Sequence, residues 1–264
     1  MKQAIVLAAY GSRHEKAVAS LDHIATRVRQ SFPGVPVRLA YTSRTVRGHM
    51  KQQGQEADSV PKALDRLLDE GVTHAVIQSL HIIPGSEYHE LLSLANDLML
   101  RKGGFTRVEV GFPLVAGERG VERVARAIAE LVPQCNTSHE AVIFMGHGTM
   151  HPGNAYYEAL HAAIQEHDPS VHVGALEAEP GIDDILVRLA RQNITRAHLL
   201  PFLFGAGWHA AKDMVGDHPE SWKSRLEQAG IHCEAILKGA GEYDQLVQIW
   251  LDHLSDAMQR LQRG

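Results

Sequence analysis

The sequence has little of what several broad classes of protein require. Its 264 residues include two cysteines, Cys135 and Cys233, which stand far apart in no metal-binding or redox spacing. No apolar run approaches the ~18 residues that cross a bilayer, so we expect no membrane span. The net charge is −5 and no basic stretch is present, which argues against a partner with a nucleic acid backbone. A reduced, cytoplasmic protein is the expectation.

Signals for export and for organic cofactors are also missing. The first residues, MKQAIVLAAYGSRHE, end their short apolar run in Gly-Ser-Arg-His rather than in a small-residue cleavage site, so we interpret them as a strand and not as a signal peptide. The chain has no P-loop and no G-x-S-x-G or C-x-x-C motif. Residues 205–210 fit G-x-G-x-x-A, but Arg225 stands where a dinucleotide site needs an acidic residue, about 20 positions on. We therefore predict no organic cofactor.

Histidine is the residue type that the sequence holds in excess. There are 17 histidines, against 6 Phe, 6 Tyr and 3 Trp. Histidine is the commonest metal ligand and the side chain that exchanges protons near neutral pH. The count therefore points to metal or proton chemistry, although many of these side chains are expected on the surface with no role.

Strand-like segments alternate with longer helical patterns along the chain. Strands are predicted at residues 3–9, 35–41, 74–80, 107–113, 141–146, 171–176, 196–204 and 231–237. Helices are predicted at residues 15–31, 61–70, 87–100, 120–131, 154–167, 182–191 and 243–261. Several strands are unbroken apolar runs, such as AIVLAA, which are typical of a parallel sheet covered on both faces. The sequence predicts an α/β fold built from right-handed βαβ units.

The two halves of the sequence repeat each other. Residues 5–13 align with 142–150, residues 32–41 with 168–177, and residues 71–85 with 193–207. Three blocks in the same order indicate a duplication, so we predict two similar parallel-sheet halves related by a pseudo-twofold axis. The polar segment 133–140 is the expected joint, which divides the chain into residues 1–134 and residues 135–264.

Ionisable side chains follow three predicted strands of the second half, namely His147, Glu177 and His209. The alignment pairs them with Tyr10, Tyr41 and Glu87 of the first half. Because ligands of open α/β sheets bind beyond the carboxyl ends of the strands, we expect the three to meet at a cleft between the halves. Two imidazoles and a carboxylate suit a divalent first-row metal, and they can also move protons. The alternative is that each side chain merely caps a helix or faces solvent.

Candidate substrate contacts lie near the strand ends of the first half. Arg13, Arg44 and Arg47 follow its first two predicted strands, and arginine suits carboxylates or phosphates. Glu87 and His89 begin a predicted helix and are placed to line the cleft. Their surroundings match no standard zinc spacing.

Six segments together carry a resemblance to a known family. They are AYTSR (40–44), IQSLHIIPGSEY (77–88), VIFMGHGT (142–149), GALE (174–177), AGWHAAKDM (206–214) and SWKSR (221–225). Through them the chain resembles the class II tetrapyrrole chelatases nearly end to end. Within that class it is most similar to the sirohydrochlorin cobaltochelatases of the CbiK type.

The resemblance implies a specific fold and reaction. The fold would be two flavodoxin-like halves around a flat macrocycle, and the enzyme would be a lyase of anaerobic cobalamin biosynthesis. It would insert Co²⁺ into sirohydrochlorin without ATP and release two protons. The family's metal ligands fall on His147, Glu177 and His209, with His147 as the proton acceptor and Glu177 assisting. Arg13 and Arg44 would then face the carboxylates of the macrocycle, and a homo-oligomer would be common for this family.

The chain departs from the family pattern at two places. Trp208 stands directly before His209, where the family usually has an acidic residue, so the metal preference is open to Fe²⁺ or Ni²⁺. Trp208 offers a flat apolar surface to a macrocycle, with core packing as its alternative. Tyr10 replaces a common phenylalanine, and its hydroxyl either reaches the cleft or has no role. The other functions that we weigh are a chelatase for a porphyrin and a tetrapyrrole or metal carrier without turnover.

Overall fold

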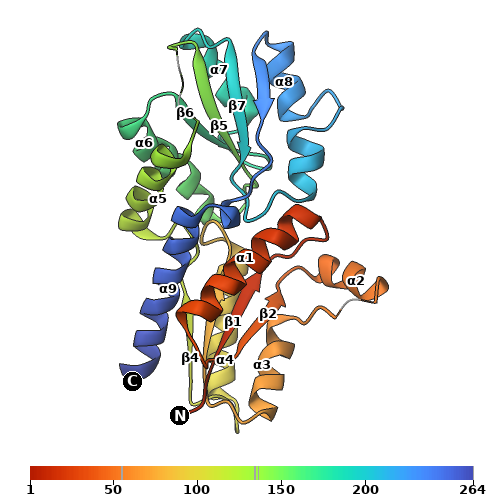
Figure 1. The fold of residues 1–264 in the computed structure, drawn as a ribbon, viewed down its shortest axis with the longest axis vertical. Helices are drawn as coiled ribbons and strands as arrows, with labels where there is room; N and C mark the ends of the chain where they lie inside the picture. Colours follow the sequence, from red (N-terminus) through yellow and green to blue (C-terminus); the bar gives the residue numbers. More distant parts are fainter. Residues whose placement is uncertain (55, 134, 136, 264) are drawn as a thin grey trace.

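The computed structural model describes residues 1–54, 56–133, 135 and 137–263. Within these residues the strands form two four-stranded parallel sheets, one above the other in Figure 1. The first sheet has the order β2-β1-β3-β4 and the second the order β6-β5-β7-β8. The strands are β1 (Gln3–Ala9), β2 (Val37–Tyr41), β3 (His74–Ser79), β4 (Arg107–Gly111), β5 (Glu140–Gly146), β6 (Val171–Ala175), β7 (Arg196–Pro201) and β8 (His232–Ala235). The predicted α/β fold with two similar halves is confirmed.

Helices cover both faces of each sheet, which explains why the central strands are apolar without interruption. The helices are α1 (Glu15–Ser31), α2 (Arg44–Gln52), α3 (Val60–Asp69), α4 (Ser86–Leu100), α5 (Gly117–Leu131), α6 (Ala155–His167), α7 (Ile182–Arg191), α8 (Trp222–Gln228) and α9 (Asp244–Arg263). Three short helical turns are η1 (Pro152–Asn154), η2 (Ala210–Met214) and η3 (Ala240–Glu242). The sequence reasoning missed α2, which buries just Met50, and α8, which is seven residues long.

The strand registers confirm most of the repeat. Gln3 on β1 pairs with His74 on β3, and Glu140 on β5 pairs with Arg196 on β7. His74 and Arg196 are also paired by the alignment of residues 71–85 with 193–207, so the registers agree with that block. Continued past the block, the same alignment places Glu87 opposite His209.

The predicted pairing of Tyr41 with Glu177 is wrong. Tyr41 stands opposite Ala9, the last residue of β1, whereas Ala175 stands opposite Gly146, the last residue of β5. Tyr41 therefore matches Ala175, and Ser43 takes the place that Glu177 has in the second half. The error is a shift of two residues, which keeps the same side chains on the same face of the strand.

The two halves exchange helices. α9 follows the last strand of the second sheet in the chain, but it packs on β3 and β4 of the first half (Figure 1). Conversely, α5 follows the last strand of the first sheet and packs along α6 of the second half. Leu7, Phe144 and Trp250 belong to a single buried apolar cluster that continues through both halves. The predicted division at residue 134 falls on a residue outside the described ones and stays a prediction.

Among the described residues, no helix is both long enough and apolar enough to cross a membrane.

Candidate functional site

Three of the predicted site residues lie together at the carboxyl ends of the second sheet. His147 follows β5, Glu177 lies two residues beyond β6, and His209 follows β7 after a short loop. The Nε2 atoms of His147 and His209 are 3.2 Å apart, with their rings almost perpendicular at 89°. Glu177 Oε2 lies 3.6 Å from Nδ1 of His147. The strand ends of one sheet thus bring together residues that are 62 positions apart in the sequence.

Glycines on either side of His147 allow the sharp exit from β5. Gly146 packs so closely on the ring of Tyr157 that a Cβ atom there would collide with it. Gly148 has φ +85°, a conformation that favours glycine, and an added Cβ would lie 2.9 Å from the backbone nitrogen of Ala178. Burial raises the pKa of Tyr157 to about 12, so its hydroxyl stays protonated beside the loop. This packing fixes the direction in which His147 leaves the strand.

Backbone hydrogen bonds carry Glu177 to the side of His147. The chain after β6 continues along the end of β5, with Leu176 N donating to Gly146 O at 3.0 Å and Glu177 N donating to His147 O at 2.8 Å. The Glu177 side chain remains 58% exposed. Its carboxylate is therefore able to exchange protons between His147 and water.

The loop before His209 is pressed against the first half. An added Cβ at Gly205 would lie 2.6 Å from Cα of Ala17 on α1, and one at Gly207 would lie 2.8 Å from Oγ of Ser12. Glycine is therefore required at position 205, where the neighbour is backbone, whereas at position 207 the hydroxyl of Ser12 could move aside. The position of His209 depends on this contact between the halves.

The histidine pair has the spacing of two ligands on one metal. Two imidazole nitrogens at ~2.0–2.1 Å from a tetrahedrally coordinated ion are ~3.3 Å apart, close to the 3.2 Å between the two Nε2 atoms. Glu177 contacts the opposite nitrogen of His147. Across the described residues, no three His, Cys, Asp or Glu side chains are gathered into a group that could hold a metal ion. The site is thus an open pair of imidazoles with a carboxylate at its edge.

In the first half, exposed groups stand at the matching strand ends. Tyr10 follows β1 and is 51% exposed. Arg13 and Arg44 are also exposed. Arg47 instead donates to the backbone oxygens of Tyr41 and Thr42 at 2.6 and 2.8 Å, so its guanidinium holds the end of β2. Of the three arginines considered, Arg13 and Arg44 have side chains that face solvent.

Glu87 and His89 lie in the first turn of α4, where the halves meet. His89 Nδ1 donates to Gly85 O at 2.9 Å, and its ring lies 4.6 Å from that of His151 in the second half. His151 Nδ1 in turn accepts a hydrogen bond from Gly153 N at 2.9 Å. The structure therefore places Glu87 and His89 at the junction of the halves, and His89 serves there in an interhalf ring contact.

Trp208 is an exposed platform beside the histidine pair. Its side chain is on the surface, with the residue 55% exposed, and its ring lies 4.9 Å from that of His209. Lys212, which the sequence reasoning did not single out, places its ammonium 4.5 Å from the centre of the indole ring. The four-residue spacing on one turn was the available signal. Core packing, the alternative for Trp208, is excluded by its exposure.

His81, two residues beyond the end of β3, is a structural residue. Its ring is bounded by the hydroxyls of Ser79 at 2.9 Å and Thr42 at 3.3 Å. Burial lowers its pKa to about 4, so the ring is neutral near pH 7.

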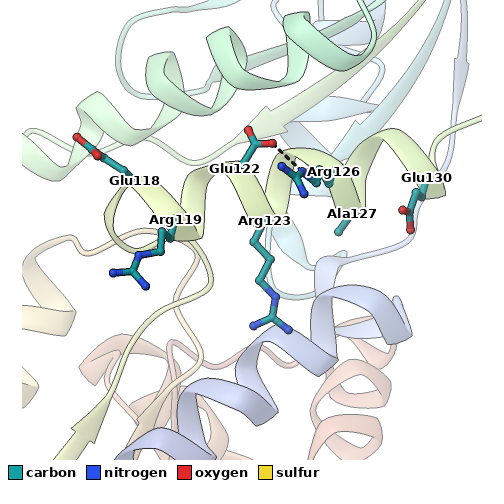
Figure 2. A pocket seen from close by; sticks show the side chains of 7 residues that line it. All are labelled: Glu118, Arg119, Glu122, Arg123, Arg126, Ala127 and Glu130. Atoms are coloured by element: carbon teal, nitrogen blue, oxygen red, sulfur yellow. Dashed lines mark hydrogen bonds and ion pairs between the residues drawn. The ribbon is translucent and has the colours of Figure 1, made fainter.

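A separate groove of about 510 Å³ runs along α5 and does not include the histidine pair (Figure 2). Figure 2 shows acidic and basic side chains alternating on this helix, with Arg126 bound to Glu122 at 2.7 Å. Arg123 is paired with Asp252 of α9. The first ion pair lies within α5 and the second joins α5 to α9, so the groove has the character of a charged helix surface.

A duplicated α/β fold with two histidines at the carboxyl ends of its second sheet defines a chelatase-like protein. The family model described as cobalt chelatase (CbiK) matches residues 3–259. The chain belongs to this family.

Two curated relatives agree with the family assignment, and a solved structure shares the fold. The sirohydrochlorin cobaltochelatase CbiKC of Nitratidesulfovibrio vulgaris is 45% identical, over 98% of this chain and 92% of the relative. The sirohydrochlorin cobaltochelatase of Salmonella typhimurium is 31% identical, over 98% of this chain and 97% of the relative. The structure of SirB from Bacillus subtilis with Fe³⁺ superposes with a TM-score of 0.66 at 16% identity, covering 97% of this chain and 96% of that chain. That likeness shows the fold.

Proposed function

We propose that this protein inserts Co²⁺ into sirohydrochlorin and releases two protons, as a metal chelatase of the lyase class. Membership of the cobalt chelatase family and the names of two relatives at 45% and 31% identity support the reaction. The observation that carries the mechanism is the 3.2 Å separation of the two Nε2 atoms of His147 and His209. Cobalt is here a substrate, and it leaves in the product.

The open histidine pair suits a metal that must be handed over. A structural site encloses its ion with four protein ligands, whereas two imidazoles leave coordination positions free for the nitrogens of the macrocycle. Glu177, whose exposed carboxylate lies beside His147, is proposed as the third ligand. The ion is held by few ligands, so its transfer to the macrocycle breaks few bonds.

Proton removal uses the same side chains. The reaction replaces two N–H protons of the macrocycle by one Co²⁺, so the charge balances when both protons leave. His147 accepts a proton at the nitrogen that the departing metal frees, and Glu177, beside it and exposed, passes protons to water. His147 and Glu177 are the catalytic residues of this proposal.

The macrocycle is oriented by its carboxylates and its flat face. Arg13 and Arg44 are exposed cations on the first half and are proposed to bind the carboxylates. Tyr10 and Trp208 offer exposed aromatic surfaces for the ring. Glu87 and His89 complete the proposed substrate contacts at the junction of the halves.

An anaerobic absorbance assay tests the function. Sirohydrochlorin is mixed with Co²⁺, Fe²⁺ or Ni²⁺ separately, with wild type, His147→Ala or no protein. We expect many turnovers with Co²⁺ and their loss in the variant. Faster turnover with Fe²⁺ or Ni²⁺ would move the proposal to another metal. One equivalent of bound ligand without turnover would identify a carrier, and rates equal to the protein-free control would refute the chelatase.

A further inference from the structure

The side chain that holds His209 in place comes from the turn that follows it. Asp213 Oδ2 lies 2.8 Å from Nδ1 of His209, and the carboxylate is 18% exposed. We infer that Asp213 is a positioning residue for the metal, acting through the orientation and the tautomer of His209. The inference rests on the proposed function, since it takes Co²⁺ as the ion.

The backbone of η2 brings the two side chains together. This turn is π-helical, with Val215 N donating to Ala210 O at 3.2 Å, five residues back. π-helical turns are rare and are frequent at functional sites. Ala210 and Met214 are fully buried and anchor the turn, so Asp213 projects from a fixed backbone toward His209.

The hydrogen-bond partners of the two histidines determine their tautomers. A carboxylate and a backbone carbonyl can only accept, so Nδ1 of His209 donates to Asp213, and Nδ1 of His147 donates to Gly148 O at 3.0 Å. In a neutral imidazole the other nitrogen then carries a lone pair. With both rings neutral, the two Nε2 atoms direct lone pairs at each other across 3.2 Å, an arrangement that a metal ion bound between them stabilises.

The partners of the two histidines differ in charge. Nδ1 of His147 donates to a neutral carbonyl at 3.0 Å, with the carboxylate of Glu177 further away at 3.6 Å, whereas Nδ1 of His209 donates directly to a carboxylate at 2.8 Å. A carboxylate behind a ligating imidazole fixes the ring and strengthens the other nitrogen as an electron-pair donor, and loss of such a partner typically weakens metal affinity by about 10–100-fold. Asp213 thus makes His209 the firmer of the two ligands.

The test compares Asp213→Ala and Asp213→Asn with a matched control. Asp217→Ala removes an exposed acidic residue four positions further along the chain. The first readout is the Kd for Co²⁺ alone, from the visible absorbance of the bound ion, and needs no turnover. The second is the KM for Co²⁺ and for sirohydrochlorin in the anaerobic assay. Circular dichroism and the unfolding midpoint report folding.

We expect Asp213→Ala to raise the Kd and the KM for Co²⁺ by about 10–100-fold, with the KM for sirohydrochlorin changed less than about twofold. Asp213→Asn keeps an oxygen that accepts from Nδ1 and loses the charge, so it should recover part of the loss. Asp217→Ala should match the wild type.

Two results overturn the inference. One is that Asp213→Ala folds and has the same Kd and KM for Co²⁺ as the wild type. If the alanine variant does not fold, the same result with folded Asp213→Asn has the same meaning. The other is an equal rise of both KM values together with a lowered unfolding midpoint, which indicates a merely structural role. Wild-type binding of Co²⁺ without turnover refutes the proposed function, while the Kd series still decides the role of Asp213. If the wild type neither binds Co²⁺ nor turns over, both fail.

Discussion

In the first half the chain leaves β1 through Tyr10, whereas at the matching point of the second half it leaves β5 through His147. The next matching places hold Ser43 and Glu177. The third pair, Glu87 and His209, completes a set in which both imidazoles of the proposed metal site lie in the second half. One backbone plan therefore carries two different sets of side chains.

The second matching place shows how one backbone position serves two purposes. In the first half Ser43 is the N-cap of α2, with its hydroxyl accepting from Val46 N at 3.3 Å. In the second half α7 takes the place of α3, directly before the matching strand, and the described residues between β6 and α7 form no helix corresponding to α2. Glu177 is thereby released from capping and faces His147. The comparison teaches that a duplicated fold separates roles when one half carries a helix that the other lacks.

The largest expected effect tests the assignment of chemistry to the second half. His147→Ala should lower kcat by about 10²–10⁴-fold, the usual contribution of a general base, with a further loss from the missing metal ligand. Tyr10→Ala, the matching change in the first half, should cost about tenfold or less. The anaerobic absorbance assay measures both. Equal losses would contradict a division of labour between the halves.

The next effect tests how far the halves are independent. Trp250 of α9 is fully buried in the cluster shared by both halves and packs on Phe204 with ring centres 5.5 Å apart. Trp250→Ala should lower the free energy of unfolding by about 3–5 kcal/mol. Trp222→Ala, whose side chain is buried within the second half alone, should cost a similar amount. Urea unfolding followed by circular dichroism measures both, and Trp250→Ala should also lower the m-value as the halves begin to unfold separately. An unchanged m-value would mean that α9 does not couple them.

Acid should weaken the second half through a buried histidine stack. The rings of His161 and His172 lie 5.6 Å apart, and burial lowers the pKa of both, that of His161 to about 4. Between pH 6.5 and about 4 the unfolded chain binds a proton at His161 and the native chain does not, so stability present above pH 6.5 is lost as the pH falls. The gap corresponds to about 3 kcal/mol for His161.

Urea unfolding at several pH values measures this loss. His161→Gln should lose less stability than the wild type between pH 6.5 and 4. In the first half, burial likewise lowers the pKa of His81 to about 4, so His81→Gln is the matched variant. If the free energy of unfolding varies with pH in the same way for wild type and His161→Gln, the histidine stack does not cause the acid sensitivity.

The smallest expected effect concerns the residue before His209. Trp208→Asp places a carboxylate near the bound cation, so the KM for Co²⁺ should fall severalfold, by about 1 kcal/mol. The same change removes the indole platform and its contact with Lys212, so the KM for sirohydrochlorin should rise by about threefold to fivefold. Steady-state kinetics with each substrate varied in turn separates the two. A rise in both KM values would mean that Trp208 serves the metal as well as the ring.

Much of the fold was predictable because its signals are local. β1, α1 and α7 have the predicted bounds, and the other main elements differ by a few residues at their ends. An apolar run followed by a periodic helix depends on residues that are neighbours in sequence, and so does an imidazole placed directly after a strand. His147 was singled out in this way, whereas Glu177 and His209 lie beyond the ends of their strands and were singled out with the help of the repeat, although its pairing of Glu177 with Tyr41 was wrong. The roles of all three remain predictions.

Other features depend on residues that are distant in sequence. A shift of two residues in a strand preserves the alternation of its faces, so the apolar pattern could not distinguish Tyr41 from Ser43 as the partner of Glu177. The sequence does not distinguish Arg47 from Arg44, whereas in the structure the guanidinium of Arg47 donates hydrogen bonds to two backbone oxygens at the end of β2. Lys212 and Asp213 gave no signal beyond a four-residue spacing, because their partners lie on a turn that local propensity does not predict.

The sequence by itself determined the α/β alternation, the duplication and the presence of histidines at the ends of the second sheet. The tertiary structure alone decided that α5 and α9 are exchanged between the halves, that two Nε2 atoms face each other at 3.2 Å, and that a carboxylate stands behind His209. The physical reason is the range of the interactions involved. Secondary structure follows from residues a few positions apart, whereas the helix exchange and the facing of the two imidazoles depend on packing between segments that the chain brings together only when it folds.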